Sequence, residues 1–357
     1  MDKVKQKALT FDDVLLLPKY SNFLPSEAST QTKLTKNINI KVPLVSAAMD
    51  TVTESSMAIA LAEAGGIGII HKNNSIEEQV ALVKKVKKYE SGVVRDPITI
   101  DSNKSIGELI QLTSELNISG MPVVDNGNLK GIVTSRDFRY ADNINASVSS
   151  IMTPLEKLVT VEEGAQQDYV KKLMHENRIE KILVVDKSGS LNGLVTMKDI
   201  EKSAEHPDAT KDNSGSLMVG AALGTESDTL KRAKALSMTG VDVFVIDSAH
   251  GHSKNVIDTI KIIKKEFPNI DIIGGNVATS EGAKELEKAG ADGIKVGMGP
   301  GSICTTRIIA GIGVPQITAI LDIKHAMKDS DIGIIADGGI RFSGDIAKAI
   351  AAGADSV

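Results

Sequence analysis

Two kinds of segment alternate along most of this chain: short apolar runs and longer amphipathic stretches. The apolar runs are rich in Val, Ile, Ala and Gly, which is typical of parallel strands buried on both faces. Seven of them are predicted as strands: 42–47, 66–70, 217–222, 243–246, 270–273, 293–297 and 332–336. Helices are expected over 54–64, 76–89, 228–239, 253–267, 281–289 and 343–352. This alternation predicts an α/β protein built on a parallel sheet.

Polar or small residues repeatedly stand where the predicted strands end: Ser46, His71, Gly224, Asp247, Asn276, Gly297 and Asp337. Side chains gathered at the carboxyl ends of strands favour a (β/α)8 TIM barrel, where that rim carries the chemistry. No GxGxxG follows the first strand, which argues against a dinucleotide-binding doubly wound sheet. Residues 1–41 are polar, contain two prolines and are expected to form an extended arm before the first strand.

The eighth strand of such a barrel would begin at 355–357, where the sequence ends. We therefore expect a barrel with the eighth strand onward missing, a truncated form of a longer protein. The edges of its first and seventh strands should then be unpaired, which favours aggregation and loss of activity.

An internal repeat lies between the second helix and the third strand. The segments 123–125 (VVD) and 131–137 (GIVTSRD) return as 184–186 (VVD) and 193–199 (GLVTMKD). Each copy is predicted to form strand, turn, strand and helix.

A strand containing proline, 96–100 or 153–159, and a helix are expected to precede each copy of this repeat. Together they form an inserted α+β region. We expect two domains: a discontinuous barrel, 1–92 and 202–357, and an insert, 93–201, with repeats of about 93–147 and 148–201.

The composition excludes several classes of protein. A net charge of −5 gives no general attraction to nucleic acid or anionic membranes, and 3% aromatic residues provide few platforms for stacking bases. The N-terminus is too polar for a signal peptide, and no apolar run is long enough to span a membrane. A single cysteine rules out an intrachain disulfide framework and suits a reducing compartment, so we expect a cytoplasmic protein.

That single cysteine, Cys304, lies in the glycine-rich stretch 297–307 (GMGPGSICTTR), directly after a predicted strand. Glycines allow close approach of the backbone to a ligand, and Ser302, Thr305 and Thr306 surround the sulfur with hydroxyls. A lone thiol is commonly a small buried apolar group. Its flexible, polar setting at the end of a strand favours a nucleophile here.

The segment 299–316 (GPGSICTTRIIAGIGVPQ) resembles the active-site loop of the IMP dehydrogenase family, whose nearest relative is GMP reductase. Segments 9–27 (LTFDDVLLLPKYSNFLPSE), 43–54 (PLVSAAMDTVTE), 245–253 (VIDSAHGHS), 274–279 (GGNVAT) and 335–357 resemble the same family in the same order. The resemblance implies NAD-dependent oxidation of inosine 5′-monophosphate (IMP) to xanthosine 5′-monophosphate, in guanine nucleotide synthesis by a homotetramer.

In that family a cysteine forms a covalent thioimidate with IMP, and Cys304 matches it. Thr306 matches the hydroxyl residue that positions the attacking water, although a threonine that stabilises a turn is the plainer interpretation. The resemblance assigns IMP binding to Ser302, Asp337, Gly338, Gly339 and Met49. An Asp-Gly-Gly turn and a methionine in the core are the plainer alternatives for the last four.

For NAD, the resemblance assigns the ribose of the nicotinamide side to Asp247 and the backbone beneath the nicotinamide to Gly297, Met298 and Gly299. An aspartate that ends a strand is equally a helix N-cap. Potassium is expected on the carbonyls of Gly299, Gly301 and Cys304. His250 and His252 have no carboxylate or thiol at ligand spacing, so solvated loop histidines are the preferred interpretation.

The insert resembles paired CBS domains, which sense adenosine nucleotides. Thr134 with Asp137, and Thr196 with Asp199, suit the binding of ribose hydroxyls, while a purely structural N-cap explains the same residues. Adenine or guanine nucleotides are therefore candidate effectors. GMP reductase, or a nucleotide-binding regulator without turnover, remains the alternative function. The insert favours the dehydrogenase, because most reductases lack it.

Overall fold

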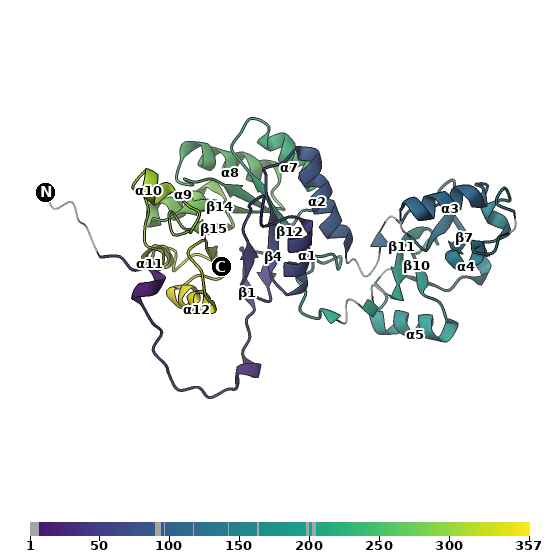
Figure 1. Ribbon diagram of the computed structural model, residues 1–357, viewed down its shortest axis with the longest axis horizontal. Helices are drawn as coiled ribbons and strands as arrows, with labels where there is room; N and C mark the ends of the chain where they lie inside the picture. The colour runs from purple at the N-terminus through teal and green to yellow at the C-terminus, as the bar shows by residue number, and fades with distance from the viewer. Residues whose placement is uncertain are drawn as a thin grey trace. The chain divides into compact units, whose positions relative to one another are not determined.

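The computed structural model divides the chain into two compact units (Figure 1): residues 1–89 with 208–357, called unit 1, and residues 90–207, called unit 2. It describes residues 7–89, 94–95, 97–116, 118–141, 143–162, 164–197, 200–201 and 205–357. None of the helices in these ranges is long and apolar enough to cross a membrane.

Unit 1 is built on a parallel seven-stranded sheet with the order β16-β15-β14-β13-β12-β4-β3. The strands are β3 (Val45–Ser46), β4 (Ile67–Ile70), β12 (Val219–Leu223), β13 (Val243–Asp247), β14 (Asp271–Val277), β15 (Gly293–Val296) and β16 (Gly333–Ala336). The helices are α1 (Ser55–Glu63), α2 (Ile76–Tyr89), α7 (Thr229–Ser237), α8 (Lys254–Glu266), α9 (Ser280–Ala289), α10 (Thr306–Ile309), α11 (Gln316–Ala326) and α12 (Ser343–Ala352). The α/β class predicted from the sequence is confirmed, and the arrangement is TIM-barrel-like.

Successive residues of one strand contribute to two different hydrophobic clusters. On β13, Val243 and Val245 belong to an inner cluster, whereas Phe244 and Ile246 belong to the cluster that packs against the helices. Side chains alternate across a strand, so apolar residues at every position mean that both faces of the sheet are buried. Burial of both faces of the sheet is the reason that the strands are continuous apolar runs in the sequence.

The N-terminal segment is only partly the extended arm that we expected. β1 (Thr32–Lys33) and β2 (Asn39–Ile40) form an antiparallel hairpin that places Leu34 in the inner cluster, fully buried. Asn37 Nδ2 donates to Asp271 Oδ1 at 2.8 Å, at the start of β14. A side chain at Gly333 would place its Cβ 2.0 Å from the carbonyl oxygen of Leu34, so the start of β16 needs glycine to accommodate the hairpin.

The last residues of the chain connect the two edges of the sheet. The Val45 amide donates to the carbonyl of Val357 at 2.7 Å, and the Val357 amide donates to the carbonyl of Pro43 at 2.9 Å. On the other side, Ser356 forms a parallel bridge with Ile335. The expectation that the first and seventh strands would be unpaired is therefore wrong, because three residues suffice to hydrogen-bond both edges.

All six predicted helices agree with the structure to within two residues at each end, and α2 and α12 agree at both ends. The prediction missed α11, which begins after Pro315 and buries most of its length, from Gln316 to Ile320 and Ile323. It also missed the single turn α10 beside the cysteine. The helix that we predicted over 228–239 ends earlier, at Ser237, and the first strand is shorter, at Val45–Ser46.

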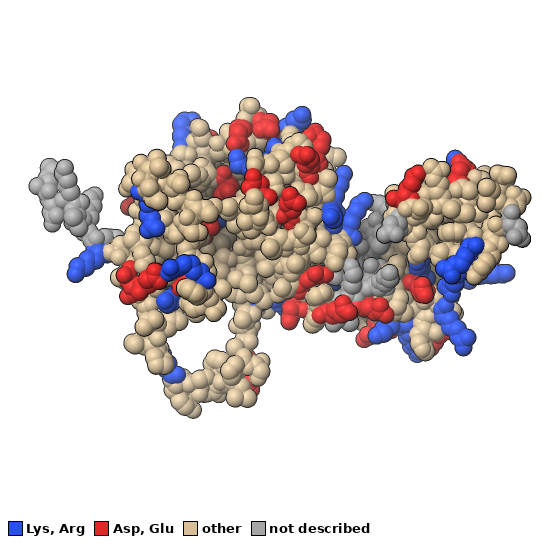
Figure 2. Space-filling model, viewed as in Figure 1, with Lys and Arg blue, Asp and Glu red and all other residues tan. Residues whose placement is uncertain are grey.

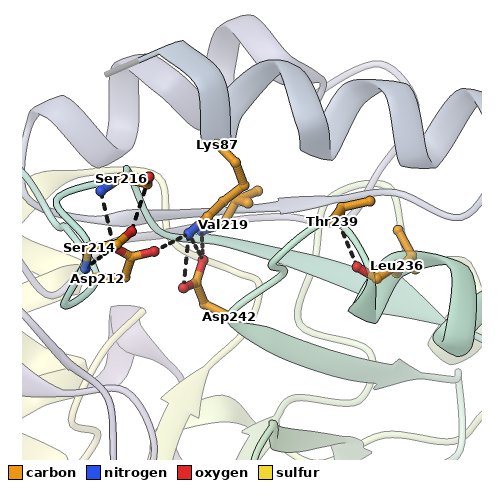
Figure 3. Close-up of polar contacts among 8 residues, drawn as sticks. All are labelled: Lys87, Asp212, Ser214, Ser216, Val219, Leu236, Thr239 and Asp242. Carbon is orange, nitrogen blue, oxygen red and sulfur yellow. Dashed lines mark hydrogen bonds and ion pairs between the residues drawn. The ribbon is translucent and has the colours of Figure 1, made fainter. Parts of the chain in front are cut away.

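Lys87 forms an ion-pair cluster within unit 1 (Figure 3), near the points where the chain leaves this unit and returns to it. Its Nζ lies 2.9 Å from Asp212 Oδ2 and 2.9 Å from Asp242 Oδ2. Asp242 also accepts a hydrogen bond from the Val219 amide at 2.8 Å. Lys87 stands in the last turn of α2, so this cluster ties the outgoing chain to the returning chain.

Unit 2 contains two small sheets, with the orders β6-β7-β8 and β5-β11-β10-β9. The strands are β5 (Val94–Arg95), β6 (Gly120–Asp125), β7 (Asn128–Thr134), β8 (Thr153–Pro154), β9 (Thr160–Glu162), β10 (Lys181–Val185) and β11 (Leu191–Thr196); the helices are α3 (Ile106–Glu115), α4 (Ser135–Phe138) and α5 (Gln167–Asn177). Leu129 and Ile132 of the first sheet share a cluster with Leu183 and Leu194 of the second.

The strand expected over 153–159 is wrong in its extent. Only Thr153–Pro154 of this range form a strand, because a 3-10 turn at Leu155–Lys157 separates them from β9. Of the segment 96–100, residue 96 lies outside the described residues, and Ile100 makes an isolated parallel bridge to Val123.

Candidate active site

The loop that carries Cys304 leaves β15 and ends at α10, which starts at Thr306. The Cys304 amide donates to the Gly301 carbonyl at 3.2 Å, and Cys304 Sγ lies 3.3 Å from Thr306 Oγ1. Hydrogen bonding from Thr306 lowers the pKa of Cys304, with a smaller contribution from the charge of Arg307, while burial opposes the shift. The thiolate is the reactive form of cysteine, so this loop favours a nucleophile.

The Asp337-Gly-Gly turn packs against the cysteine loop. Gly338 and Gly339 have φ of +85° and +79°, conformations that glycine adopts without strain. A Cβ on Gly338 would lie 3.2 Å from the Gly301 nitrogen, so bare backbone is required for this contact. The structure therefore brings together two segments about 35 residues apart that the sequence had marked separately, the cysteine loop and the aspartate turn.

A lysine that we did not single out in the sequence joins the predicted carboxylates. Lys295 Nζ, on β15, lies 2.7 Å from Asp247 Oδ1 and 2.8 Å from Asp337 Oδ2. Asn276 Nδ2 donates to the same Asp337 oxygen at 2.7 Å and to the Gly297 carbonyl at 2.9 Å. The sequence did contain a signal for Lys295, which is a charged residue inside the apolar run 293–297. Side chains alternate along a strand, and Ile294 and Val296 face outward to the helices, so Lys295 must face the opposite side.

Gln316 is a second residue that the sequence did not mark. Its Nε2 donates to the Val296 carbonyl at 2.8 Å and to the Asp337 carbonyl at 3.2 Å, from the first residue of α11. It thereby holds the ends of β15 and β16 in position. Pro315 before a helix start gave the only local signal for it.

A cavity opens at the carboxyl ends of the strands and is lined by Lys295 and Asp337, together with Val45, Ser46, Ala47, Ala48, Ile69, Val245, Ile273, Ile335, Ala336 and Val357. Met49 stands one residue beyond this lining, with its amide donating to the Ala47 carbonyl at 2.8 Å. Ser302 is exposed on the cysteine loop. His71, predicted for the same rim, is buried, and neither ring nitrogen has a hydrogen-bond partner among the described residues.

The residues expected to bind NAD and potassium contribute mostly main-chain atoms. Gly299 has φ +86°, and the neighbouring Met298 carbonyl accepts from the Val314 amide at 3.2 Å. The Gly301 carbonyl already accepts from the Cys304 amide and keeps one lone pair. Within the described ranges, no cluster of three or more His, Cys, Asp or Glu side chains could hold a metal ion. An oxygen-only set of carbonyls suits a hard cation such as potassium.

In unit 2, Thr134 and Asp137 form a capping box at the start of α4. Asp137 Oδ2 accepts from the Thr134 amide at 2.6 Å and from its hydroxyl at 2.8 Å. Both residues also line a cavity of about 640 Å³, whose lining includes Arg136, Arg139 and Lys157. Thr196 ends β11, whereas Asp199 lies outside the described residues.

Comparison with known proteins adds family membership to this geometry. The family model described as "IMP dehydrogenase / GMP reductase domain" matches residues 8–357. Inosine-5′-monophosphate dehydrogenase of Haemophilus influenzae is 53% identical over 356 residues, covering 99% of this chain and 73% of that protein. The protein of the same name from Escherichia coli strain K12 is 53% identical over 358 residues, covering 100% of this chain and 73% of that protein.

Solved structures similar to this chain include GMP reductase from Trypanosoma brucei in complex with guanosine 5′-triphosphate, with a TM-score of 0.89 and 40% identity, covering 99% of this chain and 85% of that one. A cysteine-to-alanine variant of that reductase with guanosine 5′-monophosphate gives a TM-score of 0.89 at 39% identity, covering 99% and 75%. Since these matches cover 99% of this chain, this GMP reductase also contains a region that corresponds to the insert. By sequence and by structure, the chain belongs to the IMP dehydrogenase / GMP reductase family.

Proposed function

We propose that this protein oxidises IMP to xanthosine 5′-monophosphate with NAD, as a step of guanine nucleotide synthesis. The observation that carries the proposal is Cys304, the single cysteine, with a lowered pKa on a loop packed against the Asp337-Gly-Gly turn. Relatives named inosine-5′-monophosphate dehydrogenase, 53% identical over nearly the whole chain, support the dehydrogenase. The reductase structures at 39–40% identity make GMP reductase the second candidate.

In this mechanism the Cys304 thiolate adds to C2 of the purine, and the new bond makes C2 able to release a hydride. NAD, when bound, accepts that hydride. The product is then attached to Sγ as a thioimidate, and water attacks C2 and releases the thiolate. Thr306 is assigned to orient that water, and its contact with Sγ supports a role of its hydroxyl in stabilising the thiolate before attack and after release.

The substrate nucleotide is assigned to Ser302, Asp337, Gly338, Gly339 and Met49. Asp337 accepts ribose hydroxyls, and the amides of the two glycines and of Ser302 face the phosphate. Met49 contacts the base. The partial exposure of Asp337 at the mouth of the cavity supports its availability to a ligand.

NAD is assigned to Asp247, for the ribose of the nicotinamide side, and to the main chain of Gly297, Met298 and Gly299. Potassium is assigned to the carbonyls of Gly299, Gly301 and Cys304, where it would hold the loop in one shape. The left-handed backbone of Gly299 supports a tight turn of the chain at these residues.

We further propose that unit 1 is a (β/α)8 barrel and that unit 2 is a tandem CBS domain that binds adenine or guanine nucleotides. The volume of the unit 2 cavity suits a nucleotide, and its basic lining suits phosphate. Figure 2 shows basic side chains gathered near α4 and α5 in this view. Thr134, Asp137, Thr196 and Asp199 are the proposed ribose contacts, and the capping box competes with this role at Asp137.

A homotetramer in the cytoplasm is the proposed assembly and location. Leu17 and Tyr20 in the N-terminal segment are 84% and 93% exposed, which supports burial of this segment against another chain. The lone cysteine suits the reducing cytoplasm.

The two candidate reactions are separated by incubating the protein with IMP and NAD⁺, and in parallel with GMP and NADPH. The proposal expects NADH only from the first mixture, and no NADH from Cys304→Ala, which should still bind IMP. NADPH consumption with GMP would instead establish the reductase. Turnover of IMP by Cys304→Ala would remove the cysteine from the mechanism.

A further inference from the structure

Lys295 lies at the centre of the charged cluster described above. It stands on β15, Asp337 follows the neighbouring strand β16, and Asp247 ends β13, two strands away on the other side. Its side chain is 17% exposed, less than those of Asp247 and Asp337. One ammonium thus connects the carboxyl ends of three strands and lies deeper than either of its partners.

The charges of this cluster determine the protonation of its members. Burial disfavours the ammonium, but the two carboxylates outweigh burial and raise the pKa of Lys295. Burial alone would raise the pKa of Asp337, and Lys295 together with Asn276 outweighs it and lowers that pKa. Lys295 is therefore charged and Asp337 is ionised at neutral pH.

The hydrogen bonds leave one oxygen of each carboxylate open. Lys295 and Asn276 both occupy Asp337 Oδ2, and Lys295 occupies Asp247 Oδ1. Among the described residues, none donates to Asp337 Oδ1 or Asp247 Oδ2. An ionised carboxylate accepts several hydrogen bonds, so each open oxygen can accept from a hydroxyl of a ligand.

We infer that Lys295 is a positioning residue that orients both ribose-binding carboxylates and couples the two ribose sites. The inference rests on the proposed function, in which Asp337 accepts hydroxyls of the IMP ribose and Asp247 those of the NAD ribose. Lys295 fixes which oxygen of each carboxylate faces its ligand. Because one ammonium serves both carboxylates, a change at one alters the charge felt at the other.

Protection of Cys304 from iodoacetamide by IMP tests this without requiring turnover, because the chain has a single cysteine. Lys295→Met should need about ten- to a hundredfold more IMP for half protection, the range for losing a charged hydrogen bond. Lys295→Arg keeps the charge and should stay within about threefold of the wild type. The wild type should prefer IMP to 2′-deoxy-IMP, and Lys295→Met should lose most of that preference, which a merely structural role would not change.

Asp247→Asn gives a second test, a variant in which one lysine faces one aspartate instead of two. Lys295 then neutralises Asp337 alone and weakens it as an acceptor, so IMP should protect about threefold less well, although Asp247 is assigned to NAD. If melting curves show that Lys295→Met is unfolded, the Asp247→Asn variant still tests the coupling between the two ribose sites.

The possible failures are distinct. If IMP does not protect Cys304 in the wild type, the proposed function fails. If it protects the wild type and Lys295→Met at the same concentration and with the same preference for the ribonucleotide, the role of Lys295 is overturned. Unchanged protection of Asp247→Asn overturns the coupling between the sites.

Discussion

At the scale of single residues, the reactivity of Cys304 depends on a hydroxyl two positions along the chain. Thr306 is the largest influence that lowers the pKa of Cys304, ahead of the charge of Arg307. Thr306→Val removes the hydroxyl but keeps the shape, so the pKa of Cys304 should rise toward that of an ordinary thiol. The rate of alkylation by iodoacetamide, measured from pH 6 to pH 10, should then reach its midpoint at a higher pH than in the wild type.

Thr306→Ser is the matched control for this experiment, because it restores the hydroxyl and should restore the lower midpoint. Identical alkylation profiles for the valine variant and the wild type would show that the hydroxyl does not act on the thiol.

Residues also show where prediction from the sequence succeeds. Cys304 and Asp337 stood out because each follows a predicted strand in a glycine-rich segment. Lys295 and Gln316 did not, because their partners are 20 to 48 residues away in sequence and only the fold brings them near. A buried cation inside an apolar strand is the one local sign that points to such a partner.

At the scale of elements, local periodicity accounts for the helices, while tertiary contact accounts for what was missed. The boundaries of α12 follow from its own sequence pattern, and α2 agrees equally well. The β1–β2 hairpin is different: its strands have two residues each, and it is held by burial of Leu34 and by Asp271. Nothing within segment 32–40 encodes those partners.

The contact between this hairpin and the sheet can be tested at Gly333. Gly333→Ala places a Cβ 2.0 Å from the Leu34 carbonyl, so backbone must move. We expect a loss of about 1–3 kcal/mol in the free energy of unfolding, measured with urea. Gly344→Ala, in α12 with nothing within 4 Å of its Cβ, is the control and should gain about 0.5–1 kcal/mol. Equal effects at both sites would contradict the role assigned to the hairpin.

The ion-pair cluster of α2 predicts a pH dependence of stability. Burial raises the pKa of Asp242 to about 6, against the opposing effect of Lys87. The folded state therefore binds this proton more tightly than the unfolded chain, and stability from this group falls as pH rises from about 4 to about 6. The shift corresponds to about 3 kcal/mol.

Asp242→Asn removes this titration. The difference in unfolding free energy between the wild type and the variant should decrease from pH 4.5 to pH 6 and be constant above about pH 7. Hydrogen bonds from Ser214 and Lys87 lower the pKa of Asp212, which faces the group, against the opposing effect of burial, so Asp212 does not produce a change over this range. Parallel stability curves for the two proteins over the whole range would contradict the raised pKa.

At the scale of the whole molecule, the order of strands and helices along the chain predicts the parallel sheet. It does not predict which residues hydrogen-bond to the two edge strands of that sheet. Seven strand-and-helix units led to the parallel sheet, since each buried apolar run must pair with neighbours. The pairing of Val45 and Ser356 with strands distant in sequence could not be predicted, because it depends on how far the sheet curves.

The Lys87 cluster gives a last prediction for the whole molecule. Lys87 stands three residues before unit 2, Asp212 lies five residues after it, and the ion pair of 2.9 Å holds the outgoing and returning chain together within unit 1. Replacing 90–207 by a short Gly/Ser linker should therefore leave unit 1 folded, with a single cooperative melting transition and with IMP still protecting Cys304. Effects of adenine and guanine nucleotides on the protein should disappear with the insert.

The matched control is the same replacement combined with Lys87→Met, which should melt at a lower temperature because two buried carboxylates lose their counter-charge. An insert-free protein that is unfolded would show that unit 2 is not separable from unit 1. An insert-free protein that still responds to the nucleotides would show that they do not act at unit 2.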